Sequence, residues 1–160
     1  MNQPVPLLEL VRSRAESSPN HIWLIDSERS VTYSEAHKEV ATRSSYLRKI
    51  GIDSGETVLT MLPNSIESVL SWLAITSLGA IDVPINTSYK GQMLTHIVKD
   101  SAADCLITTS KFHQQIIDSD AKITEGLTSI ILVGSEIKEP SIGKTFYLDY
   151  TMEAEEESKL

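Results

Sequence analysis

The sequence predicts an α/β fold in which a mostly parallel sheet is flanked by helices, and three observations support this. Apolar strand-like segments alternate with segments of helical periodicity along most of the chain. Residues 57–62 are almost continuously apolar, as expected for a strand covered on both faces. A helix over 64–78 and a second strand over 81–86 follow, which is the pattern of a right-handed βαβ unit. The rest of the chain is expected to be organised around residues 57–86.

The N-terminal segment is predicted to form a helix followed by a small hairpin. Apolar residues at helical spacing and prolines near the start predict a helix over 4–16. Residues 21–26 then resemble a short strand with little alternation. Ser27, Glu28 and Arg29 form an expected tight turn into a second strand at 30–32.

A capping box is predicted at the start of the next helix. Thr32 can accept a hydrogen bond from the third helical amide, while Glu35 reaches back to the amide of Thr32. The apolar stripe that follows continues to Gly51, where the helix is expected to end. Residues 53–56 then form a turn into the central strand.

The central βαβ unit has signals at each boundary. Pro63 cannot donate to a strand ladder and so ends the first strand. Asn64 is expected to be the helix N-cap, with Glu67 as its capping partner, and Gly79 is expected to end the helix with a positive φ. The helix is apolar on most of its circumference. It is therefore expected to be deeply buried or to lie against a partner.

The C-terminal part repeats the alternation of helix and strand. The predicted elements are a helix over 89–100, a strand over 104–108, a helix capped by Ser110 and ending at Ile117, a strand over 128–133 and a short strand over 145–148. Residues 1–150 are expected to form one α/β unit. Residues 151–160 are acidic and are expected to form a solvated, frayed tail.

Composition narrows the class of protein. The formal net charge of -8 disfavours nucleic acid as a partner, because phosphate backbones would be repelled. No apolar run approaches the length of about 18 residues needed to span a bilayer, and the N-terminus lacks the features of a signal peptide. Cys105 is the only cysteine, so no internal disulfide can form. These features predict a cytoplasmic protein.

No reaction centre is visible in the residue pattern. The segment Gly143, Lys144, Thr145 resembles the end of a phosphate-binding loop, but the required earlier glycine is absent and a strand is expected to follow. Cys105 lies in an apolar strand, and Asp82 is a single carboxylate without an acid–base partner.

The four histidines are scattered and form no metal-binding spacing, so ordinary surface or boundary positions are expected. They are His21, His37, His96 and His113. We therefore assign no catalytic, cofactor-binding or metal-binding residue.

Two motifs carry a family resemblance. Residues 31–35 resemble the first core motif of the adenylate-forming (AMP-binding) enzymes, and residues 73–86 resemble the second. The order and spacing of these motifs match the family over roughly residues 5–135. Residues 84–91 are most similar to the acyl-CoA ligase branch that includes carnitine- and crotonobetaine-CoA ligases.

The resemblance implies a parent enzyme that uses ATP, Mg²⁺ and coenzyme A. A carboxylate would attack the α-phosphate of ATP, and the thiol of coenzyme A would then displace AMP from the acyl-adenylate. The phosphate-binding loop, the ribose-binding aspartate and the C-terminal lysine of the family lie downstream of these two motifs and are not found in the 160 residues. The chain is therefore expected to be an inactive N-terminal fragment, whose partner is the remainder of the ligase. Asn64 and Asn86 are expected at most to shape the neighbouring substrate region.

Two alternatives remain open at this point. The scaffold could serve as a stand-alone interaction module that dimerises through the exposed apolar face of helix 64–78. A flavodoxin-like domain with a coincidental motif match would instead bind a ligand at the carboxyl ends of its strands.

Overall fold

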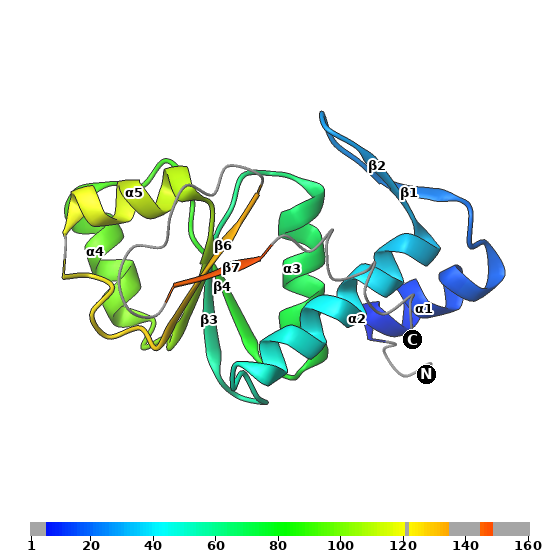
Figure 1. Ribbon diagram of the computed structural model, residues 1–160, viewed down its shortest axis with the longest axis horizontal. Helices are drawn as coiled ribbons and strands as arrows, with labels where there is room; N and C mark the ends of the chain where they lie inside the picture. Colours follow the sequence, from blue (N-terminus) through cyan, green and yellow to red (C-terminus); the bar gives the residue numbers. More distant parts are fainter. Residues whose placement is uncertain (1–5, 121, 135–144, 149–160) are drawn as a thin grey trace, which may run out of the picture.

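The computed structural model describes residues 6–120, 122–134 and 145–148. Five helices and seven strands are formed by these residues (Figure 1). The helices are α1 (Leu7–Ser17), α2 (Tyr33–Lys49), α3 (Ile66–Ser77), α4 (Gly91–Asp100) and α5 (Ser110–Ser119). The strands are β1 (Ile22–Ile25), β2 (Ser30–Thr32), β3 (Thr57–Met61), β4 (Ile81–Pro84), β5 (Cys105–Thr108), β6 (Ser129–Val133) and β7 (Thr145–Leu148).

The main sheet is parallel throughout and confirms the predicted fold class. Its strand order is β4-β3-β5-β6-β7, and each neighbouring pair runs parallel. The chain enters at β3, moves outward to β4 over one face, and crosses back to β5 over the other face. This is the open, doubly wound order 2-1-3-4-5. Helices consequently cover both faces of the sheet, as Figure 1 shows.

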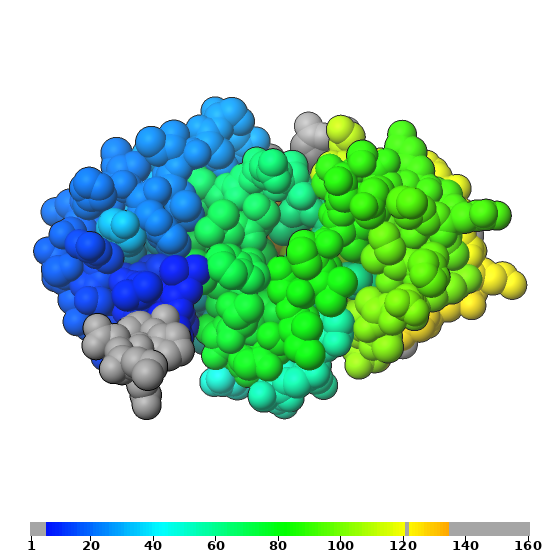
Figure 2. All heavy atoms as spheres, turned by 180° about the vertical axis from the view of Figure 1, so that it is seen from behind, coloured from blue at the N-terminus to red at the C-terminus, as the bar shows by residue number. Residues whose placement is uncertain are grey.

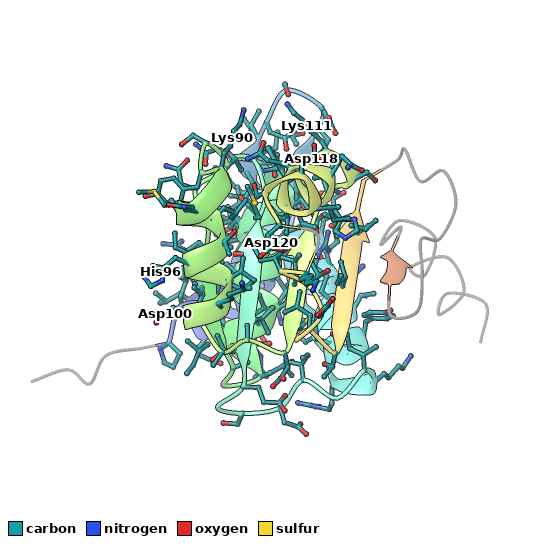
Figure 3. The ribbon with its side chains drawn as sticks, turned by 90° about the vertical axis from the view of Figure 1, so that its left-hand side faces the viewer. Lys90, His96, Asp100, Lys111, Asp118 and Asp120 are labelled. Carbon is teal, nitrogen blue, oxygen red and sulfur yellow. The ribbon has the colours of Figure 1, made fainter. Side chains whose placement is uncertain are left out.

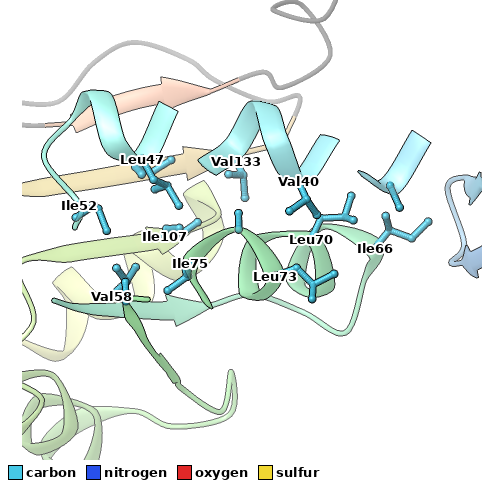
Figure 4. Packing of buried hydrophobic residues seen from close by; sticks show 14 of the residues in the cluster. Val40, Leu47, Ile52, Val58, Ile66, Leu70, Leu73, Ile75, Ile107 and Val133 are labelled. Atoms are coloured by element: carbon cyan, nitrogen blue, oxygen red, sulfur yellow. The ribbon is translucent and has the colours of Figure 1, made fainter. Parts of the chain in front are cut away.

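Two hydrophobic clusters hold the layers together, one on each face of the sheet. The first joins α1, α2 and α3 to the sheet, and Figure 4 shows Leu47 of α2 and Ile75 of α3 facing Ile107 of β5. The second lies under α4 and α5 and includes Leu94, Leu106 and several other fully buried side chains. Residues that alternate along β3 belong to opposite clusters, which explains why this strand is apolar on both faces.

The hairpin and the helix after it form as predicted. Strands β1 and β2 pair in antiparallel fashion around the turn at residues 26–29. The amide of Glu35 donates to Thr32 Oγ1 at 3.3 Å, and the amide of Thr32 donates to Glu35 Oε2 at 2.8 Å. Gly51 follows α2 with a φ of +95°, which confirms the predicted helix end.

The predicted cap of α3 is wrong by one residue. Ser65 is the N-cap, and its hydroxyl accepts from the amide of Ser68 at 3.3 Å. The Ser68 hydroxyl completes the box by accepting from the amide of Ser65 at 3.4 Å. Asn64 therefore precedes the cap, and Glu67 is free to interact elsewhere. Likewise Thr109, not Ser110, is the side-chain cap of α5.

The outer edge of β4 is poorly suited to pairing with a further strand. The amides of Ile81 and Ile85 donate toward β3 at 2.8 and 2.7 Å, so the intervening residues Asp82 and Pro84 direct their backbone outward. Pro84 has no N–H group, which leaves Asp82 as the one outward amide donor within β4. A sheet edge of this kind resists edge-to-edge association.

Several predictions fall outside the described residues. Residues 1–5, Gly143, Lys144 and the tail at 151–160 are among them. Thr145 begins strand β7, as predicted from the sequence. Within the part of the chain that the structure describes, no helix is long and apolar enough to cross a membrane.

Replacing Gly79 with alanine is expected to lower the free energy of unfolding by about 1–2 kcal/mol. Gly79 has a φ of +75°, which an L-residue adopts only with strain, and an added Cβ would lie 2.7 Å from Ser54 Oγ. Urea denaturation measures the loss. Gly126 to alanine is the matched control, since its position has open space and no positive φ. If the Gly79 variant were as stable as the parent chain, the expected strain from the positive φ and from the contact with Ser54 would be contradicted.

Candidate functional site

A groove opens at the carboxyl ends of β3 and β4, beside the first turns of α3. Its volume is about 660 Å³, which is within the range of small-molecule sites. It is lined by residues of β3 and the loop after it, of α3, and of β4 and the loop after it: Thr60, Leu62, Pro63, Asn64, Ser68, Val69, Trp72, Asp82, Pro84, Ile85, Asn86 and Thr87. Figure 2 shows the molecule from behind, with the green surface of residues near α3 and β4 between the blue N-terminal elements and the yellow-green C-terminal helices.

Among the described residues that line this groove, Asp82 supplies the one carboxylate. It faces α3 because it pairs with Val58, whose side chain belongs to the cluster on that side of the sheet. The buried hydroxyl of Thr60 donates to Asp82 Oδ1 at 2.8 Å. Burial raises the pKa of Asp82 above its ordinary value, and the hydrogen bond from Thr60 offsets only part of this shift. A half-buried carboxylate with a perturbed pKa in a groove is a candidate functional group.

The structure brings Asn64 and Asn86 to the same groove. Both are exposed and lie on loops that follow adjacent parallel strands. Asn86 Oδ1 accepts from the amide and the hydroxyl of Ser88 at 2.9 and 2.8 Å, which fixes the turn after β4. Gln115 of α5 holds the same loop by donating to the carbonyls of residues 87 and 89 at 2.9 and 2.8 Å.

Trp72 forms the apolar wall of the groove. Helix α3 was predicted to be apolar on most of its circumference, and its large residues Leu70, Leu73 and Ile75 are indeed 0–1% exposed. They are buried within the chain itself, against α2 and the sheet. Trp72 differs, because 41% of its surface is exposed and it lines the groove.

Four charged side chains form a network between the hairpin turn, α2 and α3. Arg43 of α2 is only 1% exposed and donates to Glu67 of α3 at 3.2 and 2.6 Å. It also donates to Glu39 Oε2 at 3.0 Å, and Glu39 in turn accepts from Arg29 at 2.7 and 2.9 Å. Burial raises the pKa of Glu39, but the two arginines outweigh it, so the pKa lies below its ordinary value. This network was not predicted from the sequence.

Asp26 attaches the hairpin turn to the start of α3. Its Oδ2 atom accepts from the amide of Ile66 at 3.0 Å, and its Oδ1 atom accepts from the amides of Glu28 and Arg29 at 2.9 and 3.0 Å. These three amides lower the pKa of Asp26, with the Ile66 amide contributing most. The Asp26 carboxylate therefore joins the hairpin turn directly to the start of α3.

The remaining sequence candidates lie away from the groove. Burial raises the pKa of the Cys105 thiol to about 11, so this side chain stays protonated in the sheet. His96 is exposed as expected, but His113 is buried, which corrects its prediction as a surface or boundary residue. Burial lowers the pKa of His113.

A second, smaller groove lies between α4 and α5. Its volume is about 420 Å³, and Lys90, Lys111 and Asp118, which Figure 3 labels, are among the residues that line it. The amide of Gly91 donates to Ser119 Oγ at 3.0 Å, so the first turn of α4 is already held by a side chain. We assign no function to this groove.

The described residues do not fit a nucleotide with its magnesium ion. The larger groove is lined by one carboxylate and by no lysine or arginine, and a carboxylate would repel a triphosphate. Within the described ranges, no group of three or more His, Cys, Asp and Glu side chains could hold a metal ion. We therefore derive no reaction step through ATP from these residues.

The parallel sheet and the two sequence motifs, of which the second borders the groove, are those of a known class. The family model of the AMP-binding enzyme matches residues 11–157, so this chain belongs to the AMP-binding enzyme family. The predicted family is confirmed. The strand order is flavodoxin-like, but the idea of a coincidental motif match is wrong.

The relatives are CoA ligases and peptide synthetases. The chain is 34% identical over 102 residues to 4-coumarate–CoA ligase 3 of Arabidopsis thaliana, covering 64% of this chain and 18% of that protein. It is 29% identical over 108 residues to gramicidin S synthase 2 of Brevibacillus brevis, covering 68% of this chain and 2% of that protein.

Solved structures of ligases have the same fold. An anthranilate CoA ligase in complex with anthranoyl-AMP is similar with a TM-score of 0.75 at 26% identity, over 83% of this chain and 26% of that one. A long-chain-fatty-acid-CoA ligase of Archaeoglobus fulgidus is similar with a TM-score of 0.74 at 26% identity, over 86% of this chain and 29% of that one. The chain thus spans a small part of each curated relative and little more than a quarter of these two structures.

The Asp82→Asn variant is expected to be more stable than the parent chain at pH 7. Asparagine can still accept the hydrogen bond from Thr60, and it removes a charge that burial disfavours. Since the pKa of Asp82 is raised in the folded state, its charge lowers stability as the pH rises above the ordinary value of 3.8. The gain in the free energy of unfolding of the variant over the parent chain should therefore become smaller as the pH falls toward 3.8. Urea denaturation at pH 7 and pH 4 measures it, and a gain that does not depend on pH would contradict this explanation.

Proposed function

We propose that this chain forms the N-terminal part of the large domain of an ATP-dependent, cytoplasmic acyl- or aryl-CoA ligase. The whole enzyme would join a carboxylate to the α-phosphate of ATP and release pyrophosphate. The thiol of coenzyme A would then take the acyl group and release AMP. In this proposal the chain is scaffold, and its groove residues support the reaction without carrying it.

The match of the AMP-binding family over residues 11–157 carries this proposal. The ligase structures, of which the chain spans 26–29%, support it because they share the fold over 83–86% of this chain. The groove chemistry is consistent with a supporting role, since its polar groups comprise one carboxylate, amides and hydroxyls. Developing negative charge on a reacting phosphate needs cations or an array of amide donors.

Pyrophosphate release tests the proposal. The isolated chain is mixed with ATP, Mg²⁺ and a panel of carboxylates that includes anthranilate, 4-coumarate and a long-chain fatty acid. No pyrophosphate above the background is expected, whereas 4-coumarate–CoA ligase 3 of Arabidopsis thaliana serves as the active control with 4-coumarate. Sustained turnover by the isolated chain would overturn the proposal that it is scaffold alone.

A second candidate, the stand-alone interaction module, has less support. It relied on an exposed apolar face of α3, but most of that face is buried against α2 and the sheet. Light scattering separates the two candidates. A mass clearly above 17.7 kDa would favour association of copies, and a mass of 17.7 kDa would count against it.

A further inference from the structure

The groove between α3 and β4 is lined both by a carboxylate with one unpaired oxygen and by a partly exposed tryptophan. Asp82 Oδ1 accepts from Thr60, whereas Oδ2 has no hydrogen-bond donor among the residues that the structure describes. Trp72, with 41% of its surface exposed, lines the same groove. Within the groove lining, no lysine or arginine is present to neutralise the carboxylate.

Each of these features favours a cation as the missing partner. A carboxylate can accept hydrogen bonds at both oxygens, and only Oδ1 of Asp82 accepts from Thr60, so Oδ2 is available to accept from a ligand. A planar cation with two N–H groups pairs well with a carboxylate. The face of an indole ring also attracts cations, most strongly when the cation is partly desolvated. The net charge of -8 adds a general attraction for cations.

We propose that this groove is a binding site for a flat organic cation of the amidinium or guanidinium type. Asp82 pairs with the N–H groups of the cation, and Trp72 packs against its flat face. The volume of about 660 Å³ accommodates a ring attached to the charged group. Asn64 and Asn86 at the mouth of the groove supply side-chain amides for a polar substituent. A phosphate group would not occupy this position, because the same carboxylate would repel it.

Nuclear magnetic resonance of the two tryptophan indoles tests the proposal with benzamidine as the probe. The chain contains two tryptophans, Trp23 and Trp72, and the Trp23→Phe variant assigns their indole N–H signals. Benzamidine is expected to shift the Trp72 signal in a saturable manner. Benzamide has the same shape without the charge and is expected to bind at least about tenfold more weakly, as is benzamidine to the Asp82→Asn variant.

The Asp100→Asn variant is the matched control. Asp100 is exposed at the end of α4, on the other face of the sheet, and this change alters the net charge by the same amount (Figure 3). Its affinity for benzamidine is expected to equal that of the parent chain.

A comparison with N-acetylarginine amide distinguishes the source of the cation. If benzamidine binds more tightly, the natural cation is a small molecule. If the arginine derivative binds more tightly, the natural cation is an arginine side chain of a polypeptide. Both results support a cation site. Equal affinity for benzamidine and benzamide in the unmodified chain would overturn the proposal, whatever the folding of the variants.

Discussion

Replacing Arg43 with methionine is expected to lower the free energy of unfolding by about 3 kcal/mol. Arg43 is 1% exposed and donates to the carboxylates of Glu67 and Glu39, so its loss removes the partner of both from a largely dry interface. Breaking a buried ion pair from one side costs about 3–5 kcal/mol. The lower value applies because the side chain of Glu67 is 24% exposed and Glu39 keeps Arg29. Urea denaturation at pH 7 measures the change.

Two further variants show whether the cost comes from unpaired carboxylates. Arg12→Met removes an arginine of α1 whose side chain is 59% exposed and whose pair with Glu16 spans 3.3 Å, and its effect should be at most about 0.5 kcal/mol. The double variant Arg43→Met with Glu67→Leu should recover much of the loss, because a buried pair can be replaced by apolar side chains. A loss below about 1 kcal/mol for Arg43→Met would show that the network contributes little.

The error at the start of α3 shows why this network was not predicted from the sequence. Asn64 and Glu67 have the spacing of a capping box, and so do Ser65 and Ser68 one residue later. Local spacing cannot distinguish these pairs. Glu67 instead pairs with Arg43, 24 residues earlier, and only the packing of α2 against α3 brings the two together.

Features that depend on the local backbone were predicted correctly. The reciprocal hydrogen bonds of Thr32 and Glu35, the helix end at Gly51 and the positive φ of Gly79 involve only residues within one turn. The parallel sheet was also predicted, because alternation of apolar strands and helices requires only the order of elements. The strand order itself depends on crossovers and was not predicted.

The groove itself was not predicted, although two of its residues, Asn64 and Asn86, were named as neighbours of a substrate region. Asn64 and Asn86 follow adjacent strands, so their proximity follows from the parallel arrangement of β3 and β4. Asp82 was set aside as a single carboxylate, although its position in β4 is opposite Val58 and on the side of α3. If the pairing of β3 with β4 had been known, Asp82 would have been expected near Thr60. Burial then gives this single carboxylate a perturbed pKa, which no residue pattern in the sequence can show.

Helix α3 therefore contacts α2 with one side and lines the groove with another. The side of α3 that carries Glu67 and Ser71 is fixed by Arg43, and the side that carries Ser68 and Trp72 faces the groove. The hydrogen bonds of Glu67 with Arg43 and Ser71 thus lie on the same helix as the indole of Trp72. Stability of the core and the shape of the groove are consequently coupled through α3.

Replacing Leu70 with alanine is expected to lower the free energy of unfolding by about 3–4 kcal/mol. Leu70 is 0% exposed in the cluster between α2, α3 and the sheet, so the substitution removes apolar contacts and leaves a cavity where close-packed elements can relax only partly. Leu10→Ala in α1 is the matched control: the same atoms are removed from a side chain of a residue that is 49% exposed, and a loss below about 1 kcal/mol is expected. Urea denaturation of both variants measures the difference. If the two substitutions cost the same, α3 cannot be the buried support of the groove wall, and the coupling between core and groove would be wrong.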